Sequence, residues 1–228
     1  MARPTKSEEE TALAREEILT AAAEIFMDLG YKATSVEAVA ERLGATKGLI
    51  YYHFASKAEI FFEIQRLSLS QLMALITPIA RGPGAPAERL EAMARAHLSM
   101  MMGKMAIQKV NVQGLEKYFL RADFRYAREV GEINRRRDAY EDLFAGVIEE
   151  GIRAGLFVDL PPRLLTKPFF GILNWVLVWY RSPRVENAAN MTFISDALVD
   201  YAMRGILRGG KDDSKHCDPA ALFGGPLG

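Results

Sequence analysis

Apolar residues recur at steps of three and four along most of the chain, a spacing that places them on one face of an α-helix. The first such segment runs from Arg15 to Leu29, and Gly30 supplies the left-handed residue at which helices often end. Its apolar face consists of Ile18, Ala22, Ile25, Phe26 and Leu29. No segment shows the alternation of a β-strand, so the pattern predicts an all-α protein of about nine helices.

Two short helices are expected next. Thr34 followed by Glu37 fits a capping box, in which each side chain satisfies a free backbone amide at the start of a helix. Gly44 ends this second helix, and Thr46 is placed to cap a third. The starts of these helices are therefore encoded locally.

The remaining helices are longer. Ser56 and Glu59 form a second capping box, which opens a fourth helix from Lys57 to about Ala80. The run Arg-Gly-Pro-Gly-Ala-Pro at residues 81–86 breaks it. Further helices are expected at about residues 87–102, 104–119, 124–154, 161–180 and 187–207.

The composition excludes some classes of protein. The 29 basic side chains balance 29 acidic ones, so no overall charge attracts the chain to nucleic acid or to an anionic membrane. The longest apolar run, residues 168–180, is shorter than the roughly 18 to 20 residues that cross a bilayer. Cys217 alone cannot form an intramolecular disulfide, and no apolar run resembles a signal peptide. We therefore expect a cytoplasmic protein with no membrane partner.

The second and third helices are joined by a short turn at residues 44–46, as in a helix-turn-helix whose second helix enters the major groove of DNA. Lys47 lies in the first turn of that helix, where the helix dipole disfavours a cation unless an external anion such as a phosphate is present. Gly48 costs about 1 kcal/mol of helix propensity relative to alanine, which suggests that another backbone comes close there.

Three bulky residues follow in the same helix. Tyr51, Tyr52 and His53 cannot all face the core, so at least one should face bases or phosphates. Lys57 repeats the first-turn cation in the next helix and is a second candidate for a phosphate contact. The alternative is a pair of ordinary capped surface helices with solvated lysines. The seven basic and nine acidic residues of the segment 1–57 fit that alternative, because this segment is not a basic domain.

The stretch from Arg15 to Glu63 resembles the N-terminal DNA-binding domain of TetR/AcrR-family regulators, above all in the block GYKATSVEAVAERLGATKGLIYYHFASKAE at residues 30–59. The resemblance implies that Thr34 and Lys57 touch the DNA backbone, and Ser35 begins the motif. It also implies that six residues lie on or beside the recognition helix: Thr46, Lys47, Gly48, Tyr51, Tyr52 and His53.

The sequence predicts four parts of the chain, the first and last from their polar composition and the two between them from the resemblance. They are a flexible arm at residues 1–12, a helix-turn-helix domain at 13–57, a ligand-binding and dimerisation domain at 58–208, and a disordered tail at 209–228. Members of this family usually dimerise through their last two helices. Here the helix around residues 169–180 is apolar on all sides, so a partner subunit or a ligand must cover part of it. In the final helix the matching apolar residues are Phe193, Ile194, Ala197, Leu198, Tyr201 and Ile206.

The helix expected at residues 124–154 carries arginines. Arg137 falls on the inner stripe together with Tyr140, and a desolvated charge needs a partner, either Glu116, Glu141 or the anion of a ligand. A second stripe either binds a phosphate or carboxylate or is a solvated face paired with Glu129 and Glu132. It consists of Arg121, Arg125, Arg128 and Arg135.

The region around His97 is rich in methionine, a residue that either fills cores or lines pockets for flexible apolar ligands. The segment GILNWVLVWYR at residues 171–181 is similar to the C-terminal domains of TetR-type regulators that respond to acyl-coenzyme A thioesters. The predicted ligand-binding set is His97, Met101, Met105, Tyr118, Phe119, Arg137, Tyr140, Phe170, Asn174, Trp175 and Trp179.

No motif of an enzyme appears, such as a P-loop, a nucleophile elbow or the metal-binding HExxH and CxxC patterns, so we expect no catalysis, no cofactor and no metal. The sequence predicts a homodimeric transcriptional regulator, a repressor that a small-molecule effector releases from double-stranded operator DNA. The effector would be an acyl-coenzyme A thioester or another amphipathic anion. The alternatives are the same fold responding to a hydrophobic drug-like or aromatic compound, and an architectural DNA-binding protein without an effector.

Overall fold

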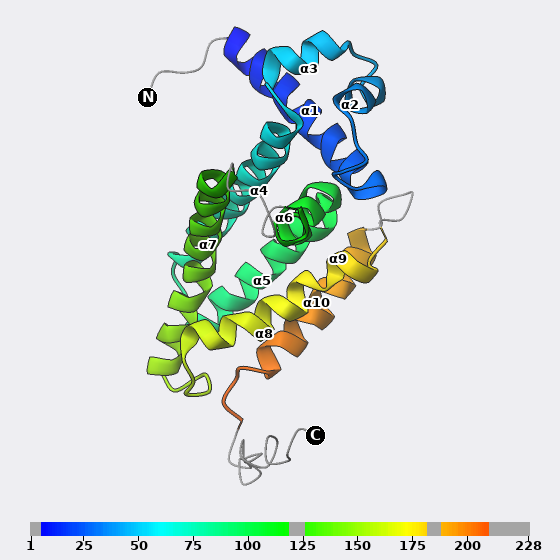
Figure 1. Cartoon of the computed structure of the whole chain (residues 1–228). Helices are drawn as coiled ribbons and strands as arrows, with labels where there is room; N and C mark the ends of the chain where they lie inside the picture. The colour runs from blue at the N-terminus through cyan, green and yellow to red at the C-terminus, as the bar shows by residue number, and fades with distance from the viewer. Residues whose placement is uncertain (1–5, 119–125, 182–187, 210–228) are drawn as a thin grey trace, which may run out of the picture.

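The computed structural model describes residues 6–118, 126–181 and 188–209, and the regular secondary structure of these residues is helical (Figure 1). The helices are α1 (Lys6–Leu29), α2 (Val36–Arg42), α3 (Lys47–His53), α4 (Lys57–Ala80), α5 (Pro86–Gly103), α6 (Met105–Tyr118), α7 (Ala127–Arg153), α8 (Pro162–Asn174), α9 (Val176–Trp179) and α10 (Ala188–Arg204). The all-α fold class is confirmed. None of the described helices combines the length and apolar character that crossing a membrane requires.

The first helix is longer than predicted. It begins at Lys6 rather than Arg15, so residues 6–12, which we expected in a flexible arm, are helical. An apolar stripe shows which part of a helix packs against a core, and it does not mark where the helix begins. The three glutamates at residues 8–10 and Ala12 have a high intrinsic helix propensity.

The three N-terminal helices and α4 enclose one apolar core, to which α6 adds Ile107 and Val110 and α7 adds Ile133. Its most buried members include Ile18, Phe26, Val39, Ile50 and Phe61. The turn between α2 and α3 passes through Gly44 with φ at 62°, a left-handed conformation that glycine adopts without strain. This core fixes the crossing of α2 and α3 that a helix-turn-helix needs.

The cap of α2 differs from the prediction. Ser35, not Thr34, is the N-cap, and its Oγ accepts a hydrogen bond from the amide of Ala38 at 3.1 Å. Thr34 is only 2% exposed and donates its hydroxyl to the carbonyl of Gly30 at 2.9 Å. Two adjacent hydroxyl residues fit the capping pattern almost equally well, and burial of the turn decides between them.

Helix α4 connects the two halves of the molecule (Figure 1). Its N-terminal half supplies Phe61 and Phe62 to the first core, and its C-terminal half supplies Leu72 and Ile76 to a second core formed with α5, α7, α8 and α10. Helix α4 is therefore packed into both cores at once.

The predicted helix at residues 161–180 is divided into α8 and α9 at Trp175. Helices α8, α9 and α10 lie together on one side of the molecule (Figure 1), and part of their apolar surface is not covered by this chain. The exposed apolar side chains on or next to these helices include Leu164, Trp175, Val178, Trp179, Phe193 and Tyr201.

Candidate DNA interface and effector cavity

Helix α3 is held at its start and on its inner face. Thr46 is its N-cap, as predicted, and Thr46 Oγ1 accepts a hydrogen bond from the amide of Leu49 at 3.3 Å. Ile50 is fully buried against the N-terminal core. The opposite face of α3 is thereby turned outward.

The outward face of α3 carries the residues predicted to touch DNA. Tyr52 is 80% exposed and Tyr51 is 46% exposed, whereas His53 is half-buried. The space that a β-carbon at Gly48 would occupy is open, since the nearest atom outside its neighbours is Thr46 Oγ1 at 3.8 Å. None of the described residues fills this space, and an external backbone has room to approach.

Lys47 already has an anion within the described part of the chain. Its ammonium group forms an ion pair with Glu37 of α2 and lies 5.5 Å from the centre of the Tyr51 ring. The hydrogen bond between the two side chains raises the pKa of Lys47 and lowers the pKa of Glu37. The first-turn cation therefore does not by itself require a phosphate, although the ammonium group remains exposed and can exchange partners.

The side chain of Lys57 is bonded within the protein, to the turn before α2. Its Nζ donates to the carbonyls of Tyr31 at 2.8 Å, Lys32 at 3.3 Å and Thr34 at 2.7 Å, and it lies 4.6 Å from the centre of the Tyr31 ring. Burial lowers the pKa of Lys57. The side chains of Lys57 and Thr34 thus stabilise the turn before α2, and neither points freely toward solvent.

The second half of the molecule contains a cavity of about 250 Å³ between α4, α5, α6, α7 and α8, which we call the central cavity. Apolar walls surround a few polar groups, the usual composition of a site for a small organic ligand. The lining residues are Leu69, Leu72, His97, Met101, Asn111, Val112, Arg137, Tyr140, Glu141, Lys167, Phe170 and Asn174.

Six of the predicted ligand-binding residues line this cavity: His97, Met101, Arg137, Tyr140, Phe170 and Asn174. Met105 packs against the apolar core, while Trp175 and Trp179 face outward and are 62% and 44% exposed. Phe119 and the side chain of Tyr118 lie outside the described residues.

The sequence did not single out the contributions of α4 and α6 to the cavity. Leu69 and Leu72 belong to the ordinary apolar stripe of α4, and Asn111 and Val112 lie in a helix with weak boundaries in the sequence. Lys167 could have been found, because it is a cation within the apolar segment that forms α8. The other positions carry no local signal that separates a cavity wall from a core.

Arg137 joins α7 to two other helices at the edge of the central cavity. Its Nη2 donates to Gln65 Oε1 of α4 at 3.1 Å, to Asn111 Oδ1 of α6 at 3.4 Å and to the carbonyl of Asn111. Glu141, one of its expected counter-charges, is instead bonded to Lys167 and Thr166. Burial raises the pKa of Glu141, but these two hydrogen bonds outweigh that effect and leave it lowered.

A neutral histidine lies in the wall of the cavity. His97 Nδ1 is 2.8 Å from the hydroxyl of Tyr140, and His97 Nε2 is 3.1 Å from Asn174 Oδ1. Burial lowers the pKa of His97 to about 4 and also raises the pKa of Tyr140. Because the amide oxygen can only accept, Nε2 carries the proton and Nδ1 accepts from the tyrosine. Because His97 and Tyr140 are both neutral, they can form hydrogen bonds with a ligand but cannot balance a charge on it.

The second arginine stripe lies only partly within the described residues. Arg128 and Arg135 are exposed on α7, and Arg121 and Arg125 lie outside the described residues. Glu132, expected as a local partner, bonds to Arg66 and Arg136. The described residues contain no group of histidine, cysteine and carboxylate side chains that could hold a metal ion.

Comparison with known proteins gives the same result for both halves of the chain. Residues 18–64 match the model of bacterial regulatory proteins of the tetR family, and residues 83–206 match a tetracyclin repressor-like C-terminal domain. The transcriptional repressor KstR2 of Mycobacterium tuberculosis is 31% identical over 196 residues, covering 84% of this chain and 94% of KstR2. The fatty acid metabolism regulator protein of Bacillus subtilis is 21% identical over 192 residues, covering 83% and 94%.

Solved structures have the same fold. The ketosteroid transcriptional regulator KstR2 of Mycobacterium tuberculosis aligns with a TM-score of 0.70 and 25% identity, over 86% of this chain and 95% of that chain. AibR in complex with isovaleryl coenzyme A and operator DNA aligns with a TM-score of 0.68 and 21% identity, over 82% and 97%. Since both of its domains match one family and a curated relative matches along most of its length, the chain belongs to the TetR family of bacterial regulatory proteins.

Proposed function

We propose that this TetR-family chain is a homodimeric transcriptional repressor whose α3 binds operator DNA and whose central cavity binds an amphipathic anion that releases it. The observation that carries the proposal is the position of Arg137. This arginine lines the cavity and also bonds to Gln65 of α4, the helix that leads directly to the helix-turn-helix. A ligand in the cavity can therefore act on α4, and through α4 on the DNA-binding domain.

The chemistry of α3 supports the DNA contact. Tyr51 and Tyr52 are exposed polar aromatic side chains that reach base edges or phosphates, and Lys47 beside them supplies a cation. At Gly48 the helix backbone is open to a phosphate strand. Lys57 and Thr34 act indirectly, because they hold the turn in front of α2.

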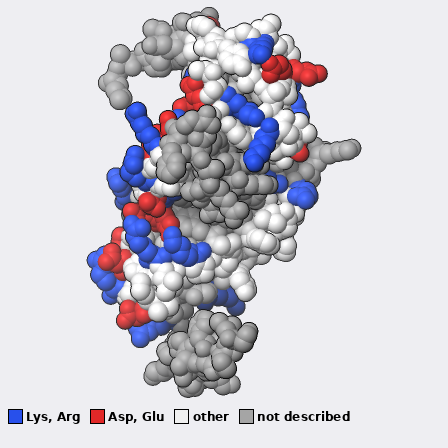
Figure 2. All heavy atoms as spheres, in the orientation of Figure 1, with Lys and Arg blue, Asp and Glu red and all other residues white. Residues whose placement is uncertain are grey.

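The dimer rests on the uncovered apolar surface of α8, α9 and α10. Figure 2 shows that the surface over the C-terminal half of α8 carries few charged side chains, and Trp175 and Phe193 are 62% and 72% exposed. An apolar surface of this kind is stable in water when a second copy covers it. Two-fold pairing would set two α3 helices about 34 to 36 Å apart, or a multiple of this distance, on successive major grooves.

The central cavity limits the effector. Its size of about 250 Å³ lies just below the roughly 300 to 1,000 Å³ usual for sites of drug-sized ligands, so it accommodates an acyl chain or a small ring but not a whole coenzyme. Leu69, Leu72 and Phe170 offer apolar contacts, while Arg137 and Lys167 attract an anionic group. A thioester would place its acyl part inside and its nucleotide outside. Two similar proteins support this class of ligand: AibR, solved in complex with isovaleryl coenzyme A and operator DNA, and the fatty acid metabolism regulator protein of Bacillus subtilis.

The release of DNA follows from competition for one guanidinium group. A carboxylate or carbonyl of the effector would replace Gln65 and Asn111 as the acceptor of Arg137. The α4–α7 contact would then rearrange and α4 would carry the N-terminal domain with it. The effector shifts the equilibrium only by the difference of its affinities for the two arrangements.

The proposal is tested by operator binding with and without effectors. An operator selected from random duplexes is titrated by fluorescence anisotropy in the presence of acyl-coenzyme A thioesters, free fatty acids or cationic aromatic drugs. We expect the thioesters to release the DNA, and Arg137→Ala to abolish this response while operator affinity stays within about threefold of the wild type. The matched control is Arg153→Ala, which removes an exposed arginine of the same helix that pairs only with Glu149 among the described residues.

The possible failures are distinct. A wild-type protein that selects no DNA sequence would refute the role of α3. Release by cationic drugs alone would refute an anionic effector, and an unchanged response of Arg137→Ala would remove this residue from the cavity mechanism.

A further inference from the structure

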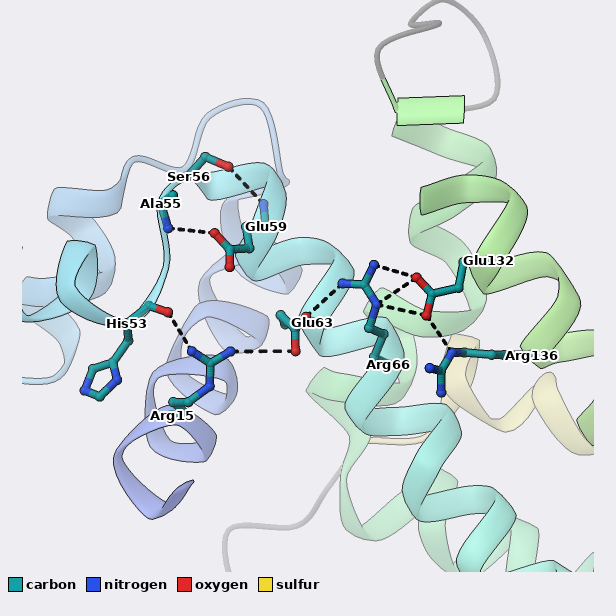
Figure 3. Close-up of polar contacts among 9 residues, drawn as sticks. All are labelled: Arg15, His53, Ala55, Ser56, Glu59, Glu63, Arg66, Glu132 and Arg136. Carbon is teal, nitrogen blue, oxygen red and sulfur yellow. Dashed lines mark hydrogen bonds and ion pairs between the residues drawn. The ribbon is translucent and has the colours of Figure 1, made fainter. Parts of the chain in front are cut away.

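A chain of charged side chains leads from α7 to the C-terminal end of α3, on a route separate from Arg137 (Figure 3). It starts at Glu132 of α7, continues through Arg66 and Glu63 of α4 to Arg15 of α1, and ends on the backbone carbonyl of His53. Four helices from both halves of the molecule thus contribute to one polar network.

Arg66 forms the links from α4 to α7 and also pairs with Glu63 on its own helix. Arg66 Nη2 and Nε lie 2.8 and 3.2 Å from Glu132 Oε2, and Arg66 Nη1 lies 2.8 Å from Glu63 Oε1. The hydrogen bond from Arg66 is the main reason that the pKa of Glu132 falls to about 2. Glu132 is therefore ionised under any condition in which the protein binds DNA, and Arg66 is held between two carboxylates.

The links between α4 and α3 pass through Arg15. Its Nη2 lies 3.8 Å from Glu63 Oε2, and its Nη1 donates to the carbonyl of His53 at 2.6 Å. The guanidinium carbon also lies 4.2 Å from the centre of the Phe54 ring. A cation at the C-terminal end of a helix satisfies a free carbonyl and interacts favourably with the helix dipole.

Helix α3 depends on such contacts because it is short. It has seven residues, and among them only Ile50 is fully buried. Its direction is fixed at the N-terminal end by Thr46 and at the C-terminal end by Arg15. A change in the position of Arg15 therefore alters the direction of the helix that meets DNA.

We propose that Glu132, Arg66, Glu63 and Arg15 form a relay that couples the position of α7 to the orientation of the recognition helix, with Arg15 as its positioning residue. The relay rests on the proposed function, in which α3 binds DNA. When α7 moves relative to α4, the ion pair between Arg66 and Glu132 breaks, and Arg66 binds Glu63 more strongly. The ion pair between Glu63 and Arg15 then weakens. The hydrogen bond from Arg15 to the carbonyl of His53 changes as a result.

A double-mutant cycle tests this coupling without any effector. The dissociation constant for the operator is measured for the wild type, Glu132→Gln, Arg15→Gln and the double variant. We expect each single change to weaken operator binding, by about two- to fivefold for Glu132→Gln, a size set by the modest strength of partly exposed ion pairs. In the Arg15→Gln background, Glu132→Gln should have no further effect, because the relay is already interrupted.

The control is Glu149→Gln, the same substitution on the same helix at a residue that pairs with Arg153 outside the relay. Its effect on operator affinity should be absent in both backgrounds. Amide hydrogen exchange gives a second readout, since the amide of Phe54 donates to the carbonyl of Ile50 at 2.9 Å at the end of α3. Exchange at Phe54 should accelerate in Glu132→Gln and not in Glu149→Gln, which a purely local loss of stability on α7 would not produce.

The outcomes separate the relay from the proposed function. A wild type that binds no operator refutes the function itself. Operator binding by the wild type together with additive effects of Glu132→Gln and Arg15→Gln, or unchanged exchange at Phe54, overturns the relay alone. If Arg15→Gln does not fold, Arg15→Lys takes its place in the cycle, since it keeps the charge but lacks the two separate nitrogens that reach Glu63 and His53.

Discussion

Two lysines with the same local sequence pattern have different environments. Lys47 and Lys57 both follow a capping hydroxyl residue and both occupy the first turn of a helix. Lys47 is half exposed and pairs with Glu37 on the neighbouring helix, whereas Lys57 donates to three carbonyls of the turn before α2. The sequence could not separate them, because the carbonyls that bind Lys57 lie 23 to 26 positions earlier in the chain.

Substituting these lysines should therefore have different consequences. Lys47→Ala should weaken binding to all DNA sequences and reduce the slope of log affinity against log salt by about one, because one phosphate contact is lost. Lys57→Met should leave the salt slope unchanged and lower the free energy of unfolding by about 1 to 3 kcal/mol, because the partly buried carbonyls of Tyr31 and Thr34 lose their donor.

The measurements are operator titrations at several salt concentrations and urea unfolding. If Lys57→Met reduced the salt slope as much as Lys47→Ala, the ammonium group would leave the turn on binding DNA, and its role would be a phosphate contact after all.

At the level of helices, boundaries set by local chemistry were predictable and boundaries set by packing were not. Thr46 caps α3 and Ser56 caps α4 at the predicted positions, since a cap depends on residues within one turn. The division of residues 161–180 at Trp175 has no such signal, because apolar residues continue on both sides of it and no proline or glycine lies at the break. The same limit applies to the central cavity, whose α4 and α6 walls look like ordinary core positions.

Two glycines of α7 have different surroundings, so replacing each by alanine should change the stability of the protein in opposite directions. The space of a β-carbon at Gly151 is occupied by the ring of Phe157, whereas nothing lies within 4 Å of such an atom at Gly146. Gly151→Ala should lower the free energy of unfolding by about 1 to 3 kcal/mol through overpacking. Gly146→Ala should raise it by up to about 1 kcal/mol, since alanine has the higher helix propensity.

Urea unfolding of the two variants checks this pair. Equal destabilisation by both substitutions would mean that glycine is needed along α7 for a reason other than the contact with Phe157.

At the scale of the molecule, two cores that share α4 and α7 explain how a ligand site and a DNA site can act together. Helix α4 contributes Phe61 to the N-terminal core and Ile76 to the second core, and its middle residues Gln65 and Arg66 bond to α7. The family resemblance allowed the two domains to be predicted from the sequence. The bonds of Arg66 and Gln65 to α7 join residues 66 and 72 positions apart and required the structure.

The quaternary structure gives the last prediction. If α8, α9 and α10 form the dimer surface, placing a charge in its apolar part should separate the subunits, because an unpaired charge buried between two copies costs several kcal/mol. Phe193→Glu on α10 and Trp175→Glu beside α8 are the appropriate changes, since both side chains are exposed in the single chain and neither fills a core. Leu75→Glu, at an exposed apolar position of α4, is the matched control.

Light scattering after size-exclusion chromatography should find monomers for the first two variants and dimers for the control. Operator affinity should fall at least tenfold in the monomers, because each half-site then binds without the high effective concentration that a linked second α3 provides. A dimer that persists in both Phe193→Glu and Trp175→Glu would place the interface on another face, and the spacing of the two α3 helices would have to be derived anew from that face.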